Sequence, residues 1–337
     1  MWDEKKVRIS DIAEELGVST ATVSNVLHGK TQKISDATVK KVEKKLEERG
    51  YISNMAATLL ARNDSRIIGV IVNDHEKYEG HTLEDPFVSA SLNYLADEIA
   101  DHNYFFMLKK IRDINEIIRF SSMWNLDGMI VIGFCEEDFQ NLRDHIRIPF
   151  VVYDGYMSGQ ERISNVKIDD FDGGKQVGKY LKKQGHDKVL CVSDNYIYMD
   201  LDRYNGLCEG LKSEVDRMTI PMKIDERVDF YEKNLDKIME YTAVFAVSDY
   251  YALDFMAFLS RKGIYVPKDI SVVGFDGSIS ALRSIPKLTT VDQNNPVRAK
   301  MAIDLLTKMI KDANYFEEKV VPVNLLEGDS VICLEIV

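Results

Sequence analysis

The stretch VRISDIAEELGVSTATVSNVLHG, residues 7–29, decides the fold of the N-terminal part of the chain. It predicts two short helices, because apolar residues recur at helical spacing on both sides of Gly17. We expect Ser10 to be the N-cap of the first helix and Gly17 to end it. The inward face of this helix is Ile12, Ala13 and Leu16.

The second helix carries the functional signal of this stretch. Ser19 is its expected N-cap, Gly29 closes it, and its core side is Val23, Val26 and Leu27. The outward side has short, uncharged hydrogen-bonding residues: Thr20, Ala21, Ser24, Asn25 and His28. Such side chains can approach base edges and phosphates in the major groove. The layout indicates a helix-turn-helix whose second helix reads DNA, with a plain three-helix bundle as the alternative.

A third helix is predicted from the Ser35 cap to Gly50, with Val39, Val42 and Leu46 on one stripe. Together with the segments ISDATVKKVEKKLEERGYISNMAATLLA (34–61) and SRIIGVIV (65–72), the opening stretch resembles the N-terminal signature of the lactose/galactose repressor (LacI/GalR) family. The Asp-Ile-Ala, Gly-Val-Ser and Ala-Thr-Val-Ser elements occur in the family's order.

The resemblance assigns roles to the outward face of the second helix. It implies that Thr20, Ala21 and Asn25 read bases. It implies that the residues at or beside the sugar-phosphate backbone are Thr22, Ser24 and His28. Asn25 stands where the family commonly has Arg, and Asn suits adenine whereas Arg suits guanine. We therefore expect an operator preference that differs from the family's.

Residues 53–66 are interpreted as a hinge helix and linker. The resemblance implies that this segment folds on operator DNA, pairs with its dimer mate, and inserts Leu60 into the minor groove. An isolated helix this short is marginal in water, and an inert linker is the alternative.

From residue 67 the pattern changes to short apolar runs separated by helix-length amphipathic stretches. The runs are 67–72, 104–108, 128–132 and 150–153, then 188–193, 242–247 and 270–275. This alternation predicts two doubly wound parallel α/β lobes after an all-α head. The resemblance implies a periplasmic-binding-protein-like sensor with three chain crossings between lobes.

The predicted domains follow from these patterns. Residues 1–52 form the helix-turn-helix domain, 53–66 the hinge, and 67–337 the effector-binding and dimerisation domain. Within the last domain, one lobe takes residues 67–163 with 292–322, and the other takes 164–291 with 323–337.

Polar residues at the carboxyl ends of the predicted strands suit a polar, neutral ligand, most simply a sugar. Carboxylates and a guanidinium can hold sugar hydroxyls, and aromatic faces can stack on a pyranose ring. The resemblance implies effector contacts for Phe87, Asp154, Arg203, Phe230, Ser248, Asp249 and Asp276. A helix cap at Asp276 and a surface ion pair at Arg203 are the structural alternatives.

The loop NDHEKYEGHTLEDP (73–86) departs from the family pattern. Its histidines and acids meet no zinc or calcium spacing, so we expect no metal and interpret the loop as a rim of the cleft, with Tyr78 as a candidate ligand contact.

Composition is consistent with this interpretation. The net charge is −12, but residues 1–66 hold 12 Lys and Arg against 10 Asp and Glu, so a weakly basic head precedes an acidic body. The four scattered cysteines and the absence of an apolar signal segment favour a cytoplasmic protein with reduced thiols.

The sequence therefore predicts a homodimeric transcriptional repressor that binds a pseudo-palindromic operator, with no cofactor, no membrane and no catalytic activity. A dimer is expected because no heptad tail follows the last strands. A purine effector or a phosphorylated protein corepressor remains an alternative to a sugar. A carbohydrate-active enzyme using Asp154 and Asp276 is a further one.

Overall fold

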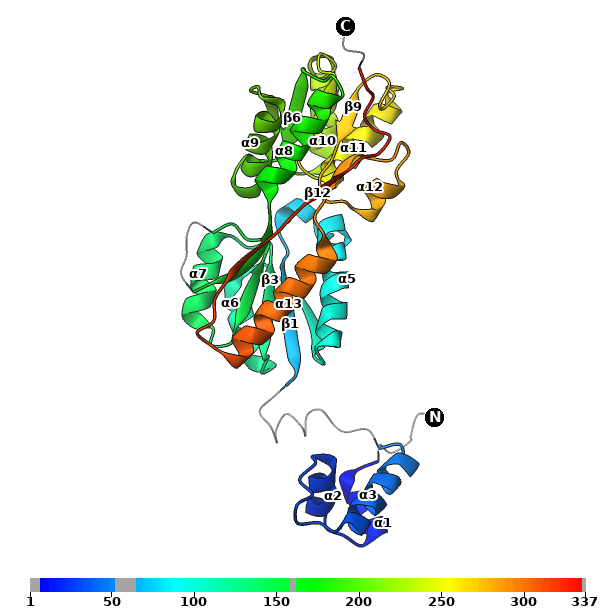
Figure 1. Ribbon diagram of the computed structural model, residues 1–337, viewed down its shortest axis with the longest axis vertical. Coiled ribbons are helices and arrows are strands. Elements are labelled where there is room, and N and C mark those ends of the chain that lie inside the picture. Colours follow the sequence, from blue (N-terminus) through cyan, green and yellow to red (C-terminus); the bar gives the residue numbers. More distant parts are fainter. Residues whose placement is uncertain (1–6, 52–64, 158–161, 335–337) are drawn as a thin grey trace. The chain divides into compact units, whose positions relative to one another are not determined.

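The computed structural model describes residues 7–51, 65–157 and 162–334, and the chain divides into two units, Met1–Ser65 and Arg66–Val337 (Figure 1). Each unit has a hydrophobic core of its own. Within the described residues, no helix combines the length and the apolar character that crossing a bilayer requires.

The first unit contains three helices, α1 (Ile9–Leu16), α2 (Thr20–Leu27) and α3 (Asp36–Glu48). Their shared core is Ile12, Ala13, Val23, Val26 and Val42. Ser19 and Ser35 cap α2 and α3 as predicted, each accepting a hydrogen bond from the backbone N–H three residues on. The prediction of Ser10 as the first cap is wrong. The N-cap is Arg8, because the Asp11 carboxylate accepts a hydrogen bond from its backbone N–H at 2.9 Å.

The second unit contains two parallel sheets. The larger has the order β11-β5-β4-β3-β1-β2. Its strands are β1 (Ile67–Asn73), β2 (Phe105–Ile111), β3 (Gly128–Ile132), β4 (Phe150–Tyr153), β5 (Ser164–Ile168) and β11 (Glu318–Val321). Helices α5 (Pro86–Asp101) and α13 (Asn295–Lys311) pack together on one face, and α6 (Ile114–Met123) and α7 (Glu136–His145) pack together on the other (Figure 1).

The smaller sheet has the order β7-β6-β8-β9. Its strands are β6 (Val189–Ser193), β7 (Asp216–Thr219), β8 (Ala243–Ala246) and β9 (Ser271–Val273). Its helices are α8 (Asp170–Lys183), α9 (Tyr198–Leu211), α10 (Ile224–Ile238), α11 (Asp249–Arg261) and α12 (Ile279–Arg283). The apolar runs of β3, β6 and β8 became fully buried strands, as expected for parallel sheets covered on both faces. The run 104–108 instead became the edge strand β2, where Phe105 is 53% exposed.

The boundary between the lobes differs from the prediction. Residues 164–168 were expected to begin the second lobe, but β5 pairs with β4 on one side and β11 on the other, so it belongs to the first sheet. The chain therefore crosses between the lobes after Ile168. Two later connections, β10 (Thr290–Asp292) and β12 (Asn324–Leu326), pair antiparallel with each other.

Helices α8 and α9 approach each other very closely, through glycines. A Cβ on Gly174 would lie 2.0 Å from the Arg203 carbonyl oxygen, and a Cβ on Gly206 would lie 2.0 Å from the Phe171 carbonyl oxygen. Backbone therefore packs on backbone, and this contact fixes the first turn of α8 against Arg203 in the middle of α9.

We predict that Gly206→Ala destabilises the protein by about 3 kcal/mol, because the added methyl group forces the two helices apart. At an exposed helix position the same substitution would instead stabilise the protein, since alanine is the better helix former by about 1 kcal/mol. Urea denaturation measures the change. Asn205→Ala, at the exposed neighbouring position, is the control and should shift stability by less than about 0.5 kcal/mol. Equal stability of the two variants would contradict the close packing.

Candidate functional site

The outward surface of α2 has the exposure expected of a base-reading helix. Thr20, Ala21 and Asn25 are exposed, while Val23 and Val26 are buried in the core of the unit. The three exposed side chains lie on one face, and none of them is needed to hold the helices together. They are therefore available to a partner surface.

Three other predicted contacts are partly engaged inside the head. The Thr22 hydroxyl lies 2.9 Å from the Ser19 hydroxyl, at the start of α2. At its end, the His28 Nδ1 atom lies 2.6 Å from the Ser24 carbonyl oxygen. Thr22, Ser24 and His28 are half-buried, so they flank the exposed face instead of forming it. The predicted wedge, Leu60, and most of the hinge segment lie outside the described residues.

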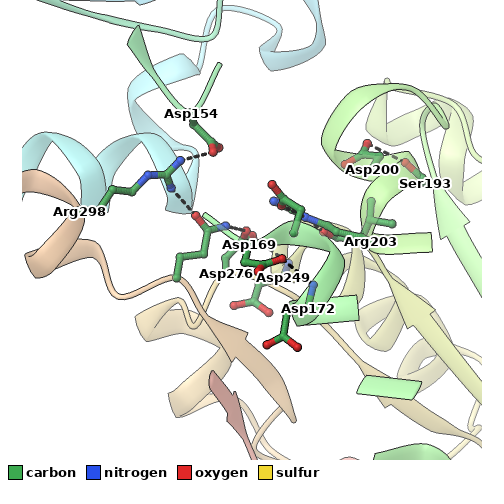
Figure 2. Close-up of polar contacts among 12 residues, drawn as sticks. Asp154, Asp169, Asp172, Ser193, Asp200, Arg203, Asp249, Asp276 and Arg298 are labelled. Atoms are coloured by element: carbon green, nitrogen blue, oxygen red, sulfur yellow. Dashed lines mark hydrogen bonds and ion pairs between the residues drawn. The ribbon is translucent and has the colours of Figure 1, made fainter. Parts of the chain in front are cut away.

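In the second unit, a series of buried polar contacts, which we call the polar network, joins the carboxyl ends of the two sheets (Figure 2). Asp154, directly after β4, forms an ion pair with Arg298 of α13. Arg298 Nη1 donates to Gln293 Oε1 at 2.7 Å, and Gln293 Nε2 donates to Asp276 Oδ1 at 2.6 Å. Asp276 follows β9 in the second lobe. The two ends of this polar network, Asp154 and Asp276, therefore belong to different lobes.

Asp276 is also coupled to the start of α11. Its Oδ2 atom accepts from the Asp249 N–H at 3.1 Å, and Asp249 in turn accepts from the Thr290 hydroxyl at 2.6 Å and from the Ser278 N–H at 2.7 Å. Burial, reinforced by the neighbouring Asp249 carboxylate, raises the pKa of Asp276 well above its usual value. A raised pKa favours the neutral acid form of a carboxyl group, which donates one hydrogen bond and still accepts others.

Arg203 is not the surface ion-pair partner considered as an alternative, because it is 95% buried. Its Nε donates to Asp170 Oδ1 at 2.7 Å, its Nη1 donates to the Val247 carbonyl oxygen at 2.7 Å, and its guanidinium stacks 3.9 Å from the Phe275 ring centroid. Burial raises the pKa of the Asp170 carboxyl, and the guanidinium offsets part of that effect. Arg203 thus supports the fold, and its predicted effector contact stays a prediction.

The remaining predicted residues divide between the polar network and the helices around it. Phe87 is half-buried, with the Arg298 guanidinium 5.3 Å from its ring, so it joins the polar chain. Ser248 caps α11 by accepting from the Tyr251 N–H at 3.3 Å. Phe230 packs 6.3 Å from the Tyr231 ring within α10 and is outside the hydrogen-bonded network. The ligand contacts of all three residues stay predictions.

Asp74, in the loop 73–86, is paired with groups of the loop, of the neighbouring strand β2 and of the residue after that strand. Asp74 accepts from the Thr82 hydroxyl, from Lys110 Nζ at 3.2 Å and from Arg112 Nε at 3.1 Å. Among the described residues, no cluster of three or more His, Cys, Asp or Glu side chains has metal-binding geometry. Burial raises the pKa of Tyr78 to about 12; Lys77 opposes this rise, and the carboxylates of Asp85 and Asp276 contribute to it, so the loop is within electrostatic reach of Asp276.

Sequence reasoning missed Arg298, Gln293 and Asp170. Arg298 could have been found, since it falls on the buried stripe of α13 with Ala302, Leu305 and Leu306. A charged residue at a core position of a helix needs a buried partner and marks a polar site.

A helix-turn-helix head combined with a two-lobed α/β sensor, whose lobes meet at a buried polar network, defines a ligand-controlled DNA-binding regulator. Comparisons with known proteins agree. Residues 8–54 match the family of bacterial regulatory proteins, lacI family, and residues 179–331 match a periplasmic binding protein-like domain.

Relatives match nearly the full length of the chain. The HTH-type transcriptional repressor PurR of Vibrio atlanticus (strain LGP32) is 31% identical over 327 residues, covering 91% of this chain and 93% of the relative. The HTH-type transcriptional regulator CelR of Thermobifida fusca is 28% identical, covering 92% and 94%. A Lac repressor dimer bound to operator and the anti-inducer ONPF has the same fold, with a TM-score of 0.82 at 22% identity over 97% of this chain and 100% of that one. The chain belongs to the lacI family of transcriptional regulators, and it is not an enzyme.

We predict that Arg203→Met lowers the free energy of unfolding by about 3–5 kcal/mol, because Asp170 would be left buried without its partner. Adding Asp170→Asn should recover part of this loss, since the remaining amide carries no charge. Urea denaturation of wild type, single variant and double variant gives the comparison. A single variant as stable as wild type would show that the pair does not support the fold.

Proposed function

We propose that the chain is an effector-controlled transcriptional repressor that binds a pseudo-palindromic operator as a homodimer in the cytoplasm. Residues 1–52 bind DNA, 53–66 form the hinge, and 67–337 bind the effector and dimerise. Effector binding changes the relation between the two lobes and, through the hinges, the affinity for DNA. The observation that carries the proposal is the combination of the exposed polar face of α2 with the buried polar chain between two lobes.

In this proposal α2 enters the major groove. Thr20, Ala21 and Asn25 contact base edges, since all three are exposed on one face. Asn25 pairs with the N6 and N7 atoms of an adenine. Contacts to the sugar-phosphate backbone come from the flanking residues Thr22, Ser24 and His28, and Leu60 contacts the minor groove.

The proposed effector is a carbohydrate held between the lobes. Each lobe contributes carboxylates and a guanidinium group, and these groups suit the hydroxyl groups of a sugar. Phe87 supplies an aromatic face. The contact residues are Phe87, Asp154, Arg203, Phe230, Ser248, Asp249 and Asp276. Solved structures of the same fold carry such ligands: a complex of the transcriptional regulator CelR with cellobiose (TM-score 0.69, 23% identity, covering 96% of this chain and 99% of that one) supports the class.

A thermal-shift panel of sugars and nucleobases tests the effector class. We expect sugars to raise the melting temperature, because a ligand that binds only the folded state stabilises it by mass action. Stabilisation by a nucleobase alone, or only by a phosphorylated carrier protein, would contradict a carbohydrate effector.

We predict that Asn25→Ala weakens operator binding by about 5-fold to 150-fold, equivalent to about 1–3 kcal/mol for one bidentate base contact. The operator is first recovered with the full-length protein by selection from random oligonucleotides, and affinity is then measured by fluorescence anisotropy. Glu14→Ala, exposed on α1, is the control and should bind as wild type does. Equal affinities of the two variants would remove Asn25 from the interface.

A further inference from the structure

A cavity of about 220 Å³ lies just outside the buried network, bounded by the end of β4, by β5 and by the first turns of α8 and α9. Asp154 and Asp170 line it, and these same carboxylates pair with Arg298 and Arg203 of the network. One wall of the cavity is therefore shared with the proposed effector site. A ligand held at the network and extended outward would enter this cavity, which we name the outer subsite.

The outer subsite presents aromatic rings that the fold covers only in part. Phe171 and Tyr156 line it and are 41% and 39% exposed. Tyr156, from the first lobe, lies 4.8 Å from the ring of Tyr198 in the second lobe at an interplanar angle of 35°. Exposed aromatic rings gathered at a cavity mark a ligand surface, and their faces suit the C–H side of a sugar ring.

The polar groups of the outer subsite are acceptors. Asp169, Asp202 and the two shared aspartates line it, and the lining lysine, Lys167, is already paired with Glu318 at 2.9 Å. Within the part of the chain that the structure describes, no hydrogen bond reaches the Asp202 carboxylate, and burial raises its pKa. Four aspartates and one lysine that is already paired thus line the cavity, which favours hydroxyl groups and opposes phosphates.

We propose that the outer subsite binds a second, neutral sugar unit, so that the effector is an oligosaccharide of at least two units. The first unit lies at the network between Asp154 and Asp276, and the second stacks on Phe171 and donates hydroxyl hydrogen bonds to Asp202. The inference rests on the proposed carbohydrate effector and specifies its size and charge.

Isothermal titration calorimetry of the full-length protein tests this proposal. The probes are glucose, galactose, cellobiose, maltose, lactose and glucose 6-phosphate. We expect one disaccharide to bind at least about tenfold more tightly than its constituent monosaccharides, and glucose 6-phosphate to bind more weakly than glucose. Phe171→Ala and Asp202→Ala should each reduce the advantage of the disaccharide. Tyr265→Ala, an exposed aromatic elsewhere on the second lobe, is the control and should keep it.

The possible failures can be told apart. Monosaccharides that bind wild type as tightly as disaccharides would overturn the outer subsite and leave the carbohydrate effector standing. The same conclusion follows if Phe171→Ala weakens the binding of monosaccharides and disaccharides equally. Its circular dichroism spectrum must then match that of wild type. A wild-type protein that binds none of these sugars would overturn both the carbohydrate effector and the outer subsite.

Discussion

The polar chain from Asp154 through Arg298 and Gln293 to Asp276 is the constraint on which the sensor unit depends. Charges buried this deeply persist only when each has a partner, because taking an ion out of water costs several kcal/mol. Both guanidinium groups at the lobe junction are paired with carboxylates, Arg298 with Asp154 and Arg203 with Asp170. A ligand that enters this network exchanges hydrogen bonds with both lobes, and so its binding energy depends on how the lobes are arranged.

The fold itself positions the charged residues of this junction. Parallel strands bring Asp154 and Asp276 to the facing ends of two separate sheets, and the glycine-lined contact of α8 with α9 places Asp170 against Arg203. Three segments then pass between the lobes, two of them paired as β10 and β12. A two-lobed body of this kind can change its closure while each lobe stays rigid, which is the mechanical requirement for regulation of a separate DNA-binding unit.

Much of this organisation could be predicted from the sequence, and the gaps have physical causes. The head followed from helical periodicity and capping residues, and the central strands followed from continuous apolar runs. The strands β5, β7 and β11 were missed because SNVKI, DRMT and EKVV are short and contain polar residues. Polar residues are tolerated in β7 and β11, which are edge strands, whereas β5 lies inside its sheet. Asp154, Arg203 and Asp276 were placed at the cleft by strand ends and family resemblance. Their partners Arg298 and Gln293 depend on long-range packing, which local patterns do not encode.

Gln293→Leu tests most directly whether the network between the lobes couples effector binding to DNA binding. Operator affinity is measured by fluorescence anisotropy, with and without the sugar that gives wild type its largest thermal shift. In wild type, we expect that sugar to change operator affinity by about 5-fold to 150-fold. In the variant, the sugar should still bind, while the change in operator affinity falls below about twofold. A variant that binds the sugar and keeps the full wild-type change would contradict this coupling.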